Sequence, residues 1–230
     1  MRTLLKRPVW KSPADAPPHA AAAVLAQRTL RFRADKRRVH EVRLQKEQNF
    51  QRALLERDAM KAAYNGNTLR LKQMFLGAQG PERRDTLHTW AKRAQSKILL
   101  DPEFYDGTTG KTILITASEM GHMDTVRFVI SWGIDINRAS LRNGMTALHA
   151  ASKRGHLRVV QILLENIARV DAPDREGKTA LHHAVAGGFV RIVQQLIDFG
   201  ANPSVADMNH LSARKLAHRM GNSRIIFLLS

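Results

Sequence analysis

One short segment has the residues of a phosphate-binding loop. The sequence Gly-Thr-Thr-Gly-Lys-Thr at residues 107–112 places a lysine and a hydroxyl directly after a glycine, the chemistry that cradles nucleotide phosphates and holds Mg²⁺. The functional motif has four residues between its glycines, whereas this segment has two. The same Gly-Lys-Thr triplet recurs at residues 177–179, so a repeated turn explains both copies. We therefore expect no nucleotide binding and no cofactor.

The ten histidines and one acidic segment are the candidate metal ligands. His149 and His182 hold one position of a repeated segment, and His122 and His156 hold another. No histidine pair has the spacing that puts two ligands on one helix face beside a carboxylate. Residues 101–107 carry acids like those of a calcium loop, but the glycine is misplaced and no terminal glutamate closes the loop. No Ser–His–Asp arrangement can be assigned either, so we expect neither a metal site nor an enzyme.

The charge of the chain is strongly positive and unevenly distributed. The net charge is +17 over 230 residues. Residues 1–60 hold 14 Lys and Arg against 6 Asp and Glu, residues 61–100 hold 8 against 2, and residues 101–230 hold 15 against 12. Net charge bears on partners and not on fold. The first hundred residues are therefore predicted to meet something acidic.

Cysteine content and hydropathy restrict the setting. The chain has no cysteine, which excludes disulfides, thiol catalysis and cysteine-based zinc sites. It has no run of about 18 apolar residues that could span a membrane. We expect an intracellular, cytoplasmic location, with mitochondrial or cytoskeletal and ciliary locations as alternatives. The mitochondrial alternative rests on residues 1–27, which are acid-poor and arginine-bearing like a transit peptide, although prolines break residues 1–18.

The Gly-Lys-Thr triplets and four of the histidines discussed above belong to a segment that repeats four times. A glycine recurs at intervals of 34, 33 and 33 residues, with an alanine four residues before it and a β-branched residue five after it. The glycines are Gly121, Gly155, Gly188 and Gly221. Two segments open with Gly-x-Thr-Ala-Leu-His, at residues 144–149 and 177–182. Apolar positions eight and nine residues after each of the first three glycines are expected to fill the space between layers.

This period and the Thr-x-Leu-His core resemble the ankyrin-repeat family. The resemblance covers roughly residues 107–230 and extends weakly back to about residue 53. It implies an all-α solenoid of helix–turn–helix repeats, whose stacked neighbours make the core, and a surface for gripping another macromolecule. It also implies that His149 and His182 bond neighbouring backbone, while Thr146 is suited to cap a helix.

The sequence departs from the family pattern at three places. Ile115 replaces the motif histidine in the first full repeat, and the motif proline is Ile113, Ala147 or Ala180. The last repeat begins Ser-Ala-Arg-Lys at residues 212–215, from which we expect a polar C-terminal cap.

A long basic helix is predicted before the repeats. Residues 20–64 contain neither Gly nor Pro and are rich in helix formers. Six basic residues lie within eleven positions of its first half: Arg28, Arg31, Arg33, Lys36, Arg37 and Arg38. At helical spacing they surround the helix and cannot all pair internally, so we expect them to contact an acidic partner. The second half is expected to dock on the repeats.

We divide the chain into four segments. Residues 1–19 are a disordered basic tail, 20–52 a basic helical extension, 53–106 a degenerate capping repeat with an inserted amphipathic helix, and 107–230 the repeats. The capping repeat is centred on Gly66, which lies 55 residues before Gly121. The excess over a regular repeat contains the predicted helix, within residues 81–100.

The predicted function is a non-catalytic protein-binding scaffold or adaptor. Protein partners would bind the repeat surface. An acidic polymer such as RNA or tubulin would bind the basic helical extension of residues 20–52, here called the N-terminal arm. We expect no membrane span and no small-molecule substrate. The alternative is a structural subunit of a large acidic assembly, either a ribonucleoprotein such as a ribosome or the microtubule-based ciliary axoneme. In addition to the six basic residues of the arm, the predicted partner-binding residues are Arg138, Arg142, Lys153, Arg154 and Arg175.

Overall fold

The structure is a computed structural model that describes residues 18–76 and 103–230, with side chains from residue 34 onward. Every regular element of these residues is an α-helix, and a single isolated bridge joins Ala206 to Ser212. The predicted all-α class is thereby confirmed. Most of the predicted tail and the whole inserted helix within residues 81–100 lie outside the described residues.

The chain divides into two compact units, residues 1–51 and residues 52–230. Helix α1 (Pro18–Tyr64) runs through the boundary and confirms the predicted long helix. In the first unit, every side chain from residue 34 to residue 51 is exposed. Apolar Val39 and Phe50 are exposed among charged neighbours, so this part of α1 buries no apolar face of its own.

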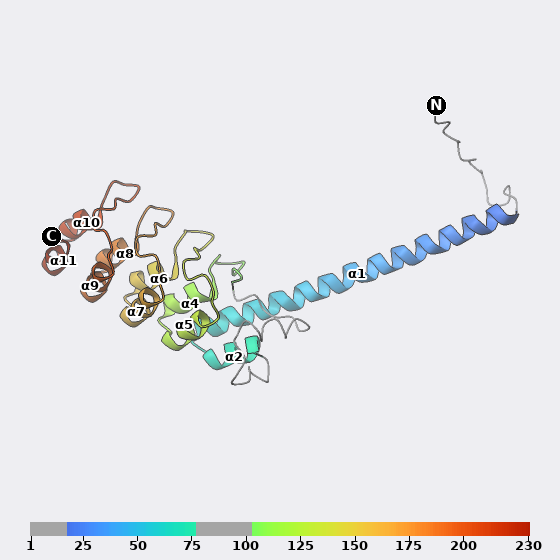
Figure 1. Cartoon of the computed structure of the whole chain (residues 1–230), viewed down its shortest axis with the longest axis horizontal. Coiled ribbons are helices and arrows are strands. Elements are labelled where there is room, and N and C mark those ends of the chain that lie inside the picture. Colours follow the sequence, from blue (N-terminus) through green and yellow to red (C-terminus); the bar gives the residue numbers. More distant parts are fainter. Residues whose placement is uncertain (1–17, 77–102) are drawn as a thin grey trace, which may run out of the picture. The chain divides into compact units, whose positions relative to one another are not determined.

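The second unit is built from helix pairs. After the end of α1 come α2 (Thr68–Leu76), α4 (Ile113–Met120), α5 (Met123–Ile130), α6 (Ala147–Arg154), α7 (Leu157–Glu165), α8 (Ala180–Ala186), α9 (Val190–Asp198), α10 (Ala213–Met220) and α11 (Ser223–Leu229). Figure 1 shows these pairs following one another along the stack. The first helices α4, α6, α8 and α10 contact each other in that order, and the second helices α5, α7, α9 and α11 form a parallel row.

Each first helix begins at a hydroxyl cap and two of them carry a full capping box. Thr146 accepts the backbone N–H of His149, and the His149 ring accepts the backbone N–H of Thr146. Thr179 and His182 repeat this arrangement in α8. The predicted role of Thr146 is therefore confirmed, and two otherwise unpaired N–H groups at each helix start are satisfied.

The core is aliphatic and lies between the two rows of helices. Leu148, Val160, Leu163 and Leu181 are all buried, as the repeat pattern predicts. The alanine four residues before each glycine is buried in every repeat, namely Ala117, Ala151, Ala184 and Ala217. A small side chain there lets neighbouring first helices approach closely, and the stack buries what a single repeat would leave exposed.

At Gly66, Gly121 and Gly155, a ring from the following repeat lies against the glycine that joins two helices. Gly155 has φ +82°, and a Cβ placed there would lie 2.6 Å from the Phe189 ring. Gly66 has φ +67° and stands in the same relation to His122, also at 2.6 Å. Both the left-handed backbone and the contact exclude a side chain. The segment predicted to be a degenerate capping repeat thus has the same contact between a glycine and a ring.

The last turns of α1 pack on the helices that follow. Ala59 and Ala63 are fully buried, and the His122 ring makes a hydrogen bond of 2.9 Å with the backbone oxygen of Tyr64. Helix α2 contributes Leu71 and Phe75 to the same core and contacts α5. The predicted docking of the second half of α1 is therefore seen only in its last turns, because every side chain from residue 42 to residue 54 is exposed.

Candidate partner-binding surface

The turns before α8 and α10 are each ordered by an aspartate at the start of the turn. The carboxylate of Asp174 accepts the backbone N–H groups of Glu176 and Lys178, each at 2.9 Å. Asp207 accepts those of Asn209 and Leu211 in the same way. Burial alone would raise the pKa of Asp174, but hydrogen bonds from His183 and from the turn outweigh burial and lower it. These two turns are therefore held by charge-assisted bonds. The turns before all four first helices are here called fingers.

The fingers are linked to one another through their backbones. Each finger after the first donates one N–H to the finger before it: Leu141 to Gly110 at 2.9 Å, Arg175 to Asn143 at 3.0 Å and Met208 to Glu176 at 3.0 Å. The Arg175 guanidinium adds a bond of 2.6 Å to the Leu141 oxygen. The finger row, residues 106–111, 140–145, 174–178 and 207–211, is thus a continuous edge.

Two buried histidines tie first helices to the following finger. The Nε2 atom of His149 lies 3.0 Å from the Lys178 oxygen, and that of His182 lies 3.0 Å from the Leu211 oxygen. The expected bonds to neighbouring backbone are therefore present. Because Nδ1 of His149 accepts from Thr146 while Nε2 donates, the ring is held neutral. Burial and then the nearby charge of His183 lower the pKa of His149 to about 4.

A cluster of charges lies beside Ile115, the residue at the histidine position of the first full repeat. Ile115 cannot make the bond, and Glu119 instead pairs with Lys111 and with Arg154, the latter at 3.0 Å. Burial raises the pKa of Glu119, yet hydrogen bonds from both partners outweigh burial and lower it. Lys111 is the lysine of the phosphate-loop-like segment. Its pairing with Glu119 supports the interpretation of that segment as a structural turn.

A small depression of about 170 Å³ lies beside this cluster, on the first helices. Its lining combines apolar and charged side chains, namely Lys111, Ile115, Glu119, Asn143, Met145, Ala150, Lys153 and Arg154. Lys153 and Arg154, two of the predicted partner-binding residues, thus both line this depression. Lys153 is exposed, whereas Arg154 shares Glu119 with Lys111.

The other predicted residues of the repeats occupy two kinds of position. Arg142 and Arg175 are exposed at the tips of adjacent fingers. Arg138 pairs with Glu103 and lies 4.6 Å from the centre of the Tyr105 ring. Because Arg138 is half-buried and engaged within the chain, it has a structural role that the sequence did not indicate.

The six predicted residues of the arm lie in α1. Lys36, Arg37 and Arg38 are exposed. Arg28, Arg31 and Arg33 fall within the helix, but their side chains lie outside the described residues. Their contact with an acidic partner stays a prediction.

Sequence reasoning missed several exposed residues of this surface. Leu141 and Met208 at the finger tips are 54% and 71% exposed, although the repeat pattern does not need apolar side chains there. Arg219 on α10 is exposed at the same repeat position as Lys153. Aligning the four repeats by their glycines would have identified Arg219.

Two kinds of feature are absent from the part of the chain that the structure describes. Among residues 18–76 and 103–230, no group of three acidic or histidine side chains could hold a metal ion. Within the same ranges, no helix has the length and apolar character needed to cross a bilayer.

The comparison with known families locates the repeats. A model of ankyrin repeats, in three copies, matches residues 137–207. The matched residues contain α6, α7, α8 and α9 and two of the finger-row segments, residues 140–145 and 174–178. No curated protein matches the chain.

Proposed function

Because the chain contains ankyrin repeats over residues 137–207, we propose that it is a non-catalytic scaffold that binds a protein partner on its finger row and first helices. Ankyrin repeats are in general modules for binding other proteins, and stacked repeats present an extended surface for this purpose. The described residues support a structural role for the polar groups, because the buried histidines and the carboxylates hold turns and helix ends.

The observation that carries this proposal is the backbone-linked finger row. Apolar Leu141 and Met208 and basic Arg142 and Arg175 are exposed along one edge whose segments bond to each other. A surface that is already ordered loses little conformational entropy on binding, which favours affinity. Apolar side chains supply contact area, and flanking arginines select acidic groups on the partner.

Substitution at the finger tips should weaken partner binding. Leu141→Ser with Met208→Ser is expected to reduce the affinity for a partner captured by the full chain at least about 10-fold, or about 1.4 kcal/mol. Ile167→Ser is the matched control, because Ile167 is 85% exposed but lies outside the finger row, and its effect should stay within about 2-fold. Affinity would be measured by calorimetry with the purified partner. Equal affinities of the original chain, the double variant and the Ile167→Ser control would refute the proposal.

The N-terminal arm is proposed as a second, electrostatic contact. Its first turn carries no acidic residue, and side chains 34–51 are exposed. Like charges along an isolated helix repel, and a polyanion would relieve that repulsion. The concentration of positive charge in the first hundred residues also supports the alternative role as a structural subunit of an acidic assembly, a ribonucleoprotein or a microtubule.

Neutralising the arm should weaken binding to a polyanion and flatten its salt dependence. The six residues Arg28, Arg31, Arg33, Lys36, Arg37 and Arg38 would be changed to Gln in the full chain. Binding to a labelled RNA duplex and to polyglutamate would be measured by fluorescence anisotropy across salt concentrations. Each lost phosphate contact on a duplex should reduce the slope of log K against log salt by about 0.9. The melting temperature of the repeats should be nearly the same in this variant as in the original chain.

A control of equal charge separates the arm from net charge. It replaces six exposed basic residues of the repeats with Gln: Arg127, Arg158, Arg169, Arg191, Lys215 and Arg219. The control should bind the polyanions more strongly than the arm variant does. If the arm variant binds at full strength, the arm is only a solvated helix. A preference for the RNA duplex over polyglutamate would favour the ribonucleoprotein alternative.

A further inference from the structure

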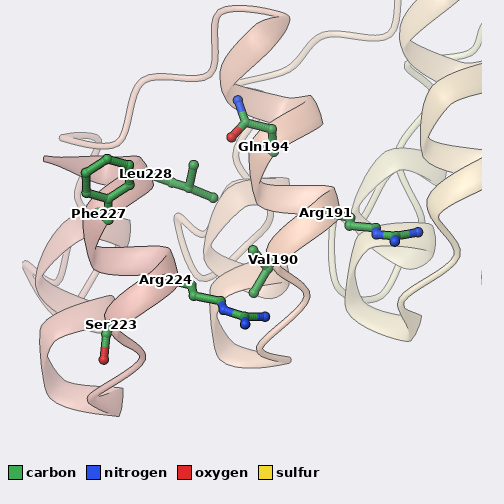
Figure 2. A pocket seen from close by; sticks show the side chains of 7 residues that line it. All are labelled: Val190, Arg191, Gln194, Ser223, Arg224, Phe227 and Leu228. Atoms are coloured by element: carbon green, nitrogen blue, oxygen red, sulfur yellow. The ribbon is translucent and has the colours of Figure 1, made fainter.

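An apolar groove lies in the row of second helices, between α9 and α11 (Figure 2). Its volume is about 510 Å³, and its apolar lining comes from Val190 on α9 and from Phe227 and Leu228 on α11. None of these residues belongs to the finger row or to the arm. The groove is therefore separate from the surfaces assigned above.

The fold does not require a phenylalanine at position 227. Phe227 follows Gly221 by six residues, and the same position of the earlier repeats holds Arg127, Gln161 and Gln194. All three are polar, so this position faces outward in the repeat pattern. Phe227 is accordingly 80% exposed. The expected polar C-terminal cap is thus wrong for α11, although Arg214 and Lys215 on α10 are exposed.

A polar bridge that spans the preceding pair of second helices has no counterpart here. Between α7 and α9, the Gln161 side chain donates to that of Gln195 at 3.3 Å. The equivalent residues between α9 and α11 are Gln194 and Leu228, and a leucine cannot form the bond. Gln194 instead bonds Asp198 on its own helix at 2.7 Å. The groove between α9 and α11 therefore stays apolar and unbridged.

Two arginines border the groove. Arg224 extends from α11 toward α9 beside Val190, while Arg191 extends from the other side of α9 (Figure 2). Both are exposed, and within the described parts of the chain neither forms an ion pair. Arg158 holds the same repeat position on α7. An apolar surface bordered by unpaired guanidinium groups is complementary to an acidic, amphipathic ligand.

We propose that this groove binds an acidic amphipathic segment of a partner protein. An apolar side chain of that segment packs between Val190, Phe227 and Leu228, and its carboxylates pair with Arg224 and Arg191. A protein segment suits the groove better than a nucleic-acid duplex, because backbone phosphates would pair with the arginines but leave Phe227 in water. Carboxylates also accept both N–H groups of one guanidinium edge.

The probe is a labelled synthetic peptide of about 14 residues, or four helical turns. It carries leucines at every third or fourth position and glutamates on both flanks of that stripe. Fluorescence anisotropy with the full chain should show saturable binding. A peptide with lysine for glutamate, and one with the same composition but scattered leucines, should each bind at least about 10-fold more weakly. No binding of the acidic peptide at millimolar protein would overturn the proposal.

Two substitutions in the groove and a matched control test the site. Phe227→Ser and Arg224→Glu should each weaken peptide binding at least about 10-fold, and because both residues are exposed the fold should be retained. Arg158→Glu makes the same charge change at the equivalent position of α7 and should change affinity less than about 2-fold. An equal loss with Arg158→Glu would mean unspecific attraction and would overturn the site.

Three other outcomes also count against the proposal. Stronger binding of a labelled single-stranded RNA, abolished by Phe227→Ser, would assign the groove to base stacking. A dimer of the full chain that is lost on Phe227→Ser would assign it to a second copy. Peptide binding lost on substitution of Leu141 and Met208 but unchanged by Phe227→Ser would place the peptide on the finger row. The first two results leave open whether the finger row binds its own partner, and the third would support binding there.

Discussion

Replacing Leu163 with alanine is expected to lower the free energy of unfolding by about 2–5 kcal/mol. Leu163 is fully buried in α7, where it fills the space between the row of first helices and the row of second helices. Truncation removes apolar contacts and leaves a cavity that the stacked helices cannot close without moving. Equilibrium urea denaturation followed by circular dichroism measures the loss.

Arg158 on the same helix provides the control. Its side chain is exposed, so Arg158→Ala should change the free energy of unfolding by less than about 0.5 kcal/mol. The pair compares a core and a surface position within two turns of one helix. If Leu163→Ala were as mild as Arg158→Ala, the layered core described for the repeats would be incorrect.

Acidification from pH 6.5 to pH 4 is expected to lower the free energy of unfolding of the repeats by about 3 kcal/mol through His149 alone. Burial and the charge of His183 lower the pKa of His149 from 6.5 to about 4. In this window the unfolded chain binds a proton that the folded chain does not. The stability contributed by the neutral, bonded ring is therefore complete above pH 6.5 and is lost as the pH falls toward 4.

Other groups with shifted pKa values act in the same direction but can be separated. The pKa of His183 is also lowered, by burial that outweighs its bond to Asp174, so His183 adds to the loss below pH 6.5. The pKa values of Glu119 and Asp174 are lowered, and the stability from these carboxylates is lost only as the pH falls through those lower values. The interval between pH 4.5 and pH 7 thus reports mainly on the histidines.

Denaturation at several pH values tests the histidine effect. His149→Gln should be less stable than the original chain at pH 7.5, because it loses the bond between the buried ring and the Lys178 oxygen, and its stability should depend less on pH between 7 and 4.5. His218→Gln is the control, since His218 is exposed on α10, and its pH profile should match that of the original chain. A His149→Gln profile as steep as the original would contradict the assignment.

The repeats could be predicted because their determinants are local and recur. The glycine, the alanine four residues before it, and the Thr-x-Leu-His core each have a fixed place within a repeat. A cap at Thr146 or a buried Leu181 follows from the residues of one repeat and the presence of a neighbour. The family resemblance supplied the bonds of His149 and His182, which residue spacing alone could not.

The side-chain pairing on the surface could not be predicted in the same way. Arg138 and Arg154 were assigned to a partner because they are charged and not needed by the core. Their acids, Glu103 and Glu119, lie 35 residues away in sequence, and only the stacking of repeats brings the pairs together. The groove beside Phe227 was missed because the last repeat was interpreted from its first helix alone.

The regular contacts between repeats also determine how the gene for this chain can change in length. Deletion of residues 147–179 removes one whole unit of 33 residues and joins Thr146 directly to Ala180. Thr146 would then cap α8 as Thr179 does now, and His182 would still reach the Leu211 oxygen. Duplication of such a unit lengthens the stack and loss of one shortens it, but each junction stays intact. Insertion of one residue within a unit would displace the glycine from the ring that covers it, so inheritance should favour whole-unit changes over small ones.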